Sequence, residues 1–162
     1  MKLCIKNGLM VNPKTHLMAV GNLWIQQDKI ICLEMDRECY GMIPPKPDED
    51  TRVVDATGKL VIQGIIDLHV HLREPGLEHK EDVESGCKAA ARGGFTTICC
   101  MPNTTPAIDS KSVVEYIDEK ARKANGVNVL SIGAMSKNQE GKELSDIQEM
   151  VSAKNNGTKV DW

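Results

Sequence analysis

Two histidines stand two residues apart in the segment IIDLHVHLREPG, residues 65–76. Side chains at positions i and i+2 of a strand leave the same face, so His69, His71 and the preceding Asp67 are expected to point together. Two neutral imidazoles suit a divalent transition metal, and the adjacent carboxylate can ligate the metal or orient a ligand. An H-x-H pair also occurs without any metal, so the spacing alone leaves both interpretations open.

Two further polar residues follow apolar runs in the same part of the chain. Arg73 comes directly after the histidines, and Asn103 lies in MPNTTP, after FTTICC. Beside a metal, the planar guanidinium of an arginine can bind a substrate carboxylate through two parallel hydrogen bonds, and an amide can add a donor. Each has an ordinary alternative, a solvated loop arginine and a turn-forming asparagine. The other histidines, His16 and His79, fall in loop and helix-start contexts where surface positions are expected.

Alternating strands and helices are predicted from residue 61 onward. The apolar segment LVIQGIIDLHVH is typical of a strand buried on both faces of a parallel sheet, and capping-box spacing marks helix starts at Ser112 and Ser145. In parallel α/β folds the ligand site lies at the carboxyl ends of the strands. The residues that fall there are His69, His71, Arg73 and Asn103. The further predicted elements are helices over 79–92, 112–125 and 145–156 and strands over 95–101 and 127–135.

Residues 1–60 predict a separate, all-β module, which leaves residues 61–162 for the parallel βα units. Asn7-Gly8 is a turn pair between apolar runs, and residues 27–29 separate two strand-like segments. The Pro-rich, acidic stretch 42–50 suits an exposed loop.

The composition excludes several classes of function. The chain is 41% hydrophobic and 27% charged, with a net charge of −3 that gives no reason to expect nucleic acid or an anionic membrane as a partner. Lys6 interrupts the only stretch where a signal peptide would need apolar residues, and no apolar run reaches a membrane span, so a cytoplasmic protein is expected. The cysteines show no C-x-x-C spacing and are expected to be buried small hydrophobic residues; they are Cys4, Cys32, Cys39, Cys87, Cys99 and Cys100.

The motifs DLHVHLREPG and MPNTTP together resemble those of the class I dihydroorotases of the amidohydrolase superfamily. Similarity extends over VVDATGKLVIQGIID, AAARGGFTTICCMPNTTP and IGAMSKNQEGKELSDIQEM, which is nearly the whole chain. Allantoinases usually have Asn at the position of Arg73 and lack MPNT, and hydantoinases keep H-x-H without the HLREPG and MPNTTP pair. Gln63 replaces the proline that usually precedes GIID, a tolerable change within a strand.

The resemblance implies an α/β fold, with an N-terminal β-sandwich segment followed by a (β/α)₈ TIM barrel. It implies one or two zinc ions and the reversible cyclisation of N-carbamoyl-L-aspartate to L-dihydroorotate in pyrimidine synthesis. His69 and His71 would ligate the more buried metal, and Arg73 and Asn103 would bind the substrate carboxylate. It also implies a homo-oligomeric complete enzyme, with aspartate carbamoyltransferase as a candidate partner.

The chain is expected to hold only part of this site. About 100 residues remain after residue 61, enough for three βα units, whereas a barrel needs roughly 200–250 residues. The family's bridging metal ligand comes on the strand after SAKNNG, where Asp161 lies about two residues early and lacks the Asp-Asp-Gly context, and the catalytic acid/base lies later still. We therefore expect the first portion of a dihydroorotase that is inactive alone. The alternatives are a non-catalytic protein that packs on a full-length partner, or a related allantoinase or hydantoinase.

Overall fold

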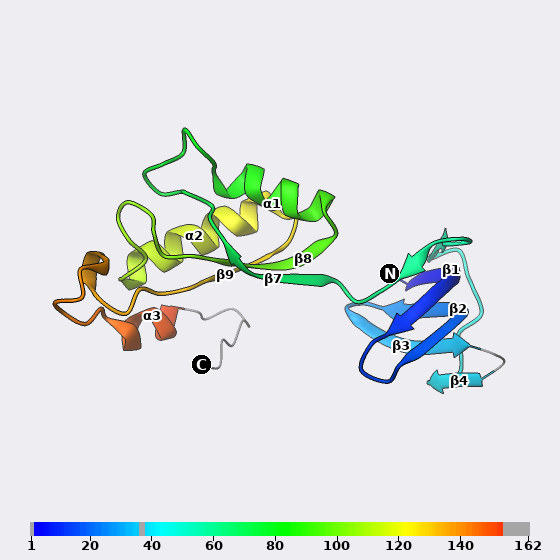
Figure 1. Ribbon diagram of the computed structural model, residues 1–162. Coiled ribbons are helices and arrows are strands. Elements are labelled where there is room, and N and C mark those ends of the chain that lie inside the picture. The colour runs from blue at the N-terminus through cyan, green and yellow to red at the C-terminus, as the bar shows by residue number, and fades with distance from the viewer. Residues whose placement is uncertain (1, 36–37, 154–162) are drawn as a thin grey trace. The chain divides into compact units, whose positions relative to one another are not determined.

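The computed structural model describes residues 2–35 and 38–153. The chain divides into two compact units, one that ends at Gln63 and one that begins at Gly64. Each unit has its own sheet (Figure 1). Among the described residues, no helix has both the length and the apolar character needed to cross a membrane.

The first unit is a single six-stranded sheet with the order β4-β3-β2-β1-β5, in which β6 also pairs with β1. Its first three strands are joined antiparallel, whereas β5 and β6 run parallel to β1. The described residues thus show one sheet of the expected sandwich segment. The strands are β1 (Lys2–Asn12), β2 (Leu17–Gln26), β3 (Lys29–Met35), β4 (Glu38–Gly41), β5 (Thr51–Asp55) and β6 (Leu60–Val61).

The predicted Asn7-Gly8 turn is wrong, because β1 continues through it as a β-bulge. The register with β2 shifts between Ile5 and Gly8, and Asn7 takes a positive φ of 60°. A bulge of this kind needs one residue in the left-handed region, which Asn tolerates well. The second predicted turn is confirmed: β2 and β3 form a hairpin across Gln27 and Asp28.

The second unit alternates parallel strands with helices. Its sheet has the order β7-β8-β9, and both pairings are parallel. In Figure 1, α1 and α2 lie along these strands. The elements are β7 (Ile65–Val70), α1 (Val83–Arg92), β8 (Phe95–Cys100), α2 (Lys111–Ala124), β9 (Asn128–Ser131), the 3₁₀ turn η1 (Lys137–Gln139) and α3 (Ile147–Ala153).

The three helices start at other residues than those predicted. Helix α1 begins at Val83, since Asp82 accepts from the Ser85 N–H and forms a capping box there. Ser112 lies inside α2, whose N-cap is Ser110. Ser145 is buried and donates its hydroxyl to the Ala134 carbonyl, so it ties the chain after β9 instead of capping α3.

The core of the second unit lies between the sheet and its helices. It joins the middle of β8 to the apolar stripes of α1 and α2 through fully or almost fully buried side chains, including Ile98, Cys100, Val83, Cys87 and Ile117. The five cysteines whose side chains are described are all buried, as predicted. Those in this unit serve as small core residues.

The predicted burial of the whole segment LVIQGIIDLHVH is wrong. Leu60 and Val61 pair with β1 in the first unit, and β7 starts only at Ile65. On β7, Ile66 and Leu68 are 58% and 71% exposed. They are i and i+2 and share one face. Of the strands in this sheet, α1 contacts chiefly β8 and α2 chiefly β9, so among the described helices none covers this face of β7.

Candidate functional site

The two histidines of the H-x-H pair lie at the carboxyl end of β7. His69 is on the strand and is exposed, while His71 follows the strand directly and is half-buried. Their ring centroids lie 5.1 Å apart, and the ring planes make an angle of 72°. The structure therefore places the two imidazoles side by side, as the i, i+2 spacing predicted, and shows that they meet edge to face.

Asp67 does not join the two rings. Its Oδ1 accepts a hydrogen bond of 3.0 Å from the backbone N–H of His69. One oxygen of the Asp67 carboxylate is therefore bonded to the backbone near the end of β7. Among the described residues, no group of three His, Cys, Asp or Glu side chains lies close enough to hold a metal ion. Asp161, the doubtful bridging ligand, lies outside the described residues.

Asn103 reaches the histidines from the next loop. Its Oδ1 lies 2.8 Å from His71 Nδ1, although 32 residues separate the two in the chain. Asn103 is exposed, and it follows β8 as His71 follows β7. The sequence placed both residues at carboxyl ends of parallel strands, and the structure brings them into direct contact.

The loops after β7 and β8 are bonded to each other along their length. The Met101 N–H donates to the Val70 carbonyl at 2.9 Å, and the Thr105 N–H donates to the Pro75 carbonyl at 2.9 Å. Gly76 makes the closest approach: it has a φ of 91°, and a Cβ there would lie 2.0 Å from the Thr105 carbonyl oxygen. Only glycine fits this backbone and this contact.

Glu74 anchors the first of these loops and was not singled out from the sequence. It is a buried carboxylate, 3% exposed, beside Arg73. Its Oε2 accepts from the Val83 N–H at 3.0 Å, at the start of α1. Its Oε1 accepts from the Tyr116 hydroxyl at 2.7 Å and pairs with Lys120 at 2.7 Å, both on α2. No local pattern could reveal these partners, because Tyr116 is 42 residues away.

The bonds of Glu74 keep it ionised. Burial raises the pKa of its carboxyl, but the hydrogen bonds from Lys120, the Val83 N–H and Tyr116 outweigh burial, so the pKa falls below its ordinary value. The hydrogen bond that each donates to Glu74 raises the pKa of the Tyr116 phenol and the pKa of the Lys120 ammonium. At neutral pH Glu74 and Lys120 are therefore charged and the Tyr116 hydroxyl keeps its proton, so all three groups stay bonded.

Arg73 sits between two buried anchors. Leu72 is in the core of the unit and Glu74 is in the cluster above, while Arg73 has a φ of 64° and is half-buried. Among the described residues, no carboxylate forms an ion pair with the Arg73 guanidinium. The structure thus holds the backbone of Arg73 on both sides, through Leu72 and Glu74.

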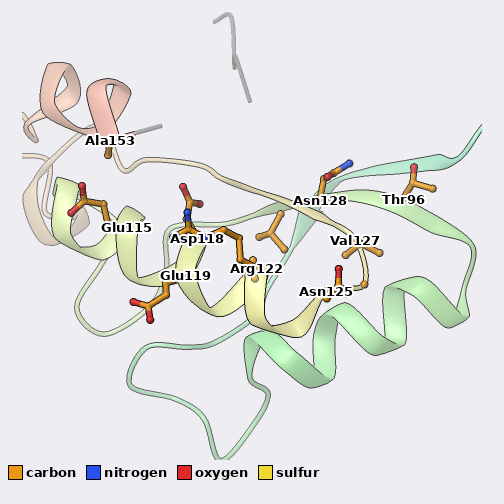
Figure 2. A pocket seen from close by; sticks show the side chains of 12 residues that line it. Thr96, Glu115, Asp118, Glu119, Arg122, Asn125, Val127, Asn128 and Ala153 are labelled. Carbon is orange, nitrogen blue, oxygen red and sulfur yellow. The ribbon is translucent and has the colours of Figure 1, made fainter. Parts of the chain in front are cut away.

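A pocket lies at the other end of the strands, away from the two histidines. It has a volume of about 720 Å³ and is lined by one side of α2 from Glu115 onward, by the starts of β8 and β9, and by Ala153 at the end of α3 (Figure 2). Asp118 and Arg122 line it from α2. Ligands of parallel sheets bind at the carboxyl ends of strands, where His69, His71 and Asn103 lie and this pocket does not.

A family model described as Dihydro-orotase-like matches residues 58–159. The chain belongs to this dihydroorotase-like family. Its curated relatives include the dihydroorotase of Solibacter usitatus, 45% identical over 94% of this chain, and that of Acetivibrio thermocellus, 44% identical over 92%. The chain spans only 34% and 33% of the lengths of these two relatives.

Solved structures of two hydantoinases are also similar to this chain, at lower sequence identity. A D-hydantoinase is 28% identical over 94% of this chain, with a TM-score of 0.67, and the match covers 29% of that protein. A D-hydantoinase from Thermus sp. is 29% identical, with a TM-score of 0.64, over 93% of this chain and 31% of its own. The dihydroorotase-like chain is therefore of mixed α/β structure and is related to cyclic amidohydrolases, of which it spans about a third.

Proposed function

We propose that this chain forms the first third of a dihydroorotase, with a β domain up to Gln63 and a barrel portion from Gly64. The enzyme would interconvert N-carbamoyl-L-aspartate and L-dihydroorotate. One observation carries the proposal: the loops after β7 and β8, which hold the family's motifs, meet at the 2.8 Å contact between His71 and Asn103. Identity of 44–45% to curated dihydroorotases, against 28–29% to the hydantoinases, favours this substrate class.

His69 and His71 fit two positions of a metal site. Neutral imidazoles are zinc ligands, and a catalytic zinc site usually takes three protein ligands. The described residues supply two, so the remaining ligands would come from outside them. When bound, zinc would lower the pKa of water and polarise the ring amide of the substrate.

Arg73 and Asn103 would bind the carboxylate that dihydroorotate and carbamoyl-aspartate share. The guanidinium would supply a bidentate fork, and the Asn103 amide a further N–H donor. The backbone anchors at Leu72 and Glu74 would hold Arg73 in place before substrate arrives. This pre-organisation favours binding because less conformational freedom is lost when the substrate binds.

The exposed elements of the second unit suit an incomplete barrel. In the described residues, β7 and β9 each pair along one edge only, and Ile66 and Leu68 of β7 lie open. Further strands would pair at these edges, and a further helix would cover the open face, as in a closed (β/α)₈ barrel. We also propose that the complete enzyme is a homo-oligomer and that it associates with aspartate carbamoyltransferase.

The test compares the 162-residue chain with the product of its complete reading frame. We expect the complete product to hydrolyse L-dihydroorotate in a zinc-dependent way and to leave hydantoin unchanged, and the 162-residue chain to be inactive. The ultraviolet absorbance of dihydroorotate follows the reaction. Preferential hydrolysis of hydantoin would show that the protein is a hydantoinase. A complete product that hydrolyses neither dihydroorotate nor hydantoin would favour the non-catalytic alternative.

A further inference from the structure

We propose that Asn103 is a positioning residue for His71: its amide oxygen selects the ring form in which Nε2 faces the metal. The inference deepens the proposed function and rests on it for the metal, but its central test does not. It starts from the 2.8 Å contact between Asn103 Oδ1 and His71 Nδ1. A role in binding the substrate carboxylate does not by itself require this contact.

The contact determines where the ring proton lies. An amide oxygen can only accept a hydrogen bond, so His71 Nδ1 must carry the hydrogen. A neutral imidazole has a single N–H, and Nε2 is then left with its lone pair. Zinc binds that lone pair, and a hydrogen-bond partner on the other ring nitrogen commonly orients such a ligand. Asn103 would thus prepare His71 for coordination through Nε2.

The loop contacts make the arrangement rigid enough to act before any metal binds. His71 directly follows β7 and Asn103 lies three residues after the end of β8. Backbone bonds tie the two loops together at Val70–Met101 and Pro75–Thr105. Among the described residues, none accepts a hydrogen bond from Asn103 Nδ2. One amide would therefore serve two purposes, with Oδ1 on the histidine and Nδ2 directed to the substrate carboxylate.

Magic-angle-spinning NMR of the ¹⁵N-histidine-labelled 162-residue chain tests the tautomer directly. The method reads ring nitrogens in soluble and associated protein alike, and His71→Gln assigns the signals among four histidines. At mildly alkaline pH we expect Nδ1-protonated His71 in the wild type. Asn103→Leu should shift the tautomer ratio about tenfold toward Nε2–H, the change that one net hydrogen bond sustains. Asn103→Asp keeps an acceptor and should retain the wild-type form.

Asn128→Leu is the matched control, because this exposed asparagine lies on β9 and bonds to Thr97 instead; it should leave the His71 signals unchanged. Nε2–H in the wild type would overturn the proposal, since the amide would then be turned with Nδ2 toward the ring. A wild-type ratio in Asn103→Leu would overturn it as well. These signals do not depend on turnover, so a failure of the proposed function stays distinguishable.

Zinc affinity of the complete reading-frame product, measured without substrate, gives a second readout. Asn103→Leu should weaken zinc binding about 10–100-fold, the usual effect of losing a partner behind a ligand, whereas Asn103→Asp should retain it. A residue that only binds substrate would leave zinc affinity unchanged in both variants. That result would assign Asn103 to the substrate alone.

Discussion

Replacing Glu74 by alanine removes the acceptor for three donors at once. The costliest loss is at the start of α1, because Val83 is fully buried and its N–H would have no acceptor. A buried donor without a partner costs about 1–3 kcal/mol. Tyr116 and the Lys120 ammonium are partly exposed and can turn to water. We therefore expect Glu74→Ala to lower the free energy of unfolding of the second unit by about 2 kcal/mol.

Urea unfolding followed by the helical circular dichroism signal measures this loss. In the described residues every α-helix lies in the second unit, so the signal reports that unit. Glu119→Ala is the matched control, since it removes a glutamate of α2 whose bond to Lys123 is exposed. That variant should unfold close to the wild type. Equal stability of the two variants would show that Glu74 is not an anchor.

The effect should depend on pH in a defined direction. The folded-state pKa of Glu74 lies below its ordinary value, so its contribution is fully present above the unfolded pKa of roughly 4.3. It is lost as the pH falls through the lower folded-state value. The difference between wild type and Glu74→Ala should therefore shrink below about pH 4. A difference that stays constant from neutral pH into this acidic range would refute the assigned role of the charge.

Three further predictions concern the site. Gly76→Ala should destabilise the second unit by at least about 2 kcal/mol. Gly141 has a similar positive φ and no atom within 4 Å of an added Cβ, so Gly141→Ala should cost less in the same urea assay. Equal costs would show that the close approach to Thr105 is not the cause. His69→Ala with His71→Ala should abolish zinc retention on dialysis of the complete protein, and full metal content would disprove the pair as ligands. Arg73→Lys should raise KM and lower kcat/KM for dihydroorotate, since an ammonium cannot form the bidentate fork; unchanged kinetics would make Arg73 a surface residue.

Local pattern predicted the order of strands and helices in the second unit, because periodicity records which faces are buried. It misjudged β7, whose apolar residues Ile66 and Leu68 are exposed in this chain. The apolar residues of β7 indicate a strand suited to burial on both faces. The described residues include no element that covers Ile66 and Leu68. Ser145 shows a second limit: its spacing to Gln148 suggested a cap, but a bond to Ala134 uses its hydroxyl.

The candidate site was predictable in its residues but not in its supports. His69, His71 and Asn103 could be named because parallel strands present their carboxyl ends at one edge. Glu74 could not, since its importance arises from donors on α1 and α2 that are distant in sequence. The pair Gly76 and Thr105 was equally hidden, because a close backbone approach leaves no periodic trace.

The bonded loops after β7 and β8 have a consequence for engineering new specificity. Gly76 against Thr105, and Glu74 against Tyr116, mean that neither loop keeps its shape independently of its neighbours. A chimera that takes only HLREPG from a relative would meet a foreign partner loop and a foreign α2 surface. Transplanting both loops together with the facing residues of α2 would preserve every contact. For this chain, the smallest exchangeable module is therefore two loops and a helix face.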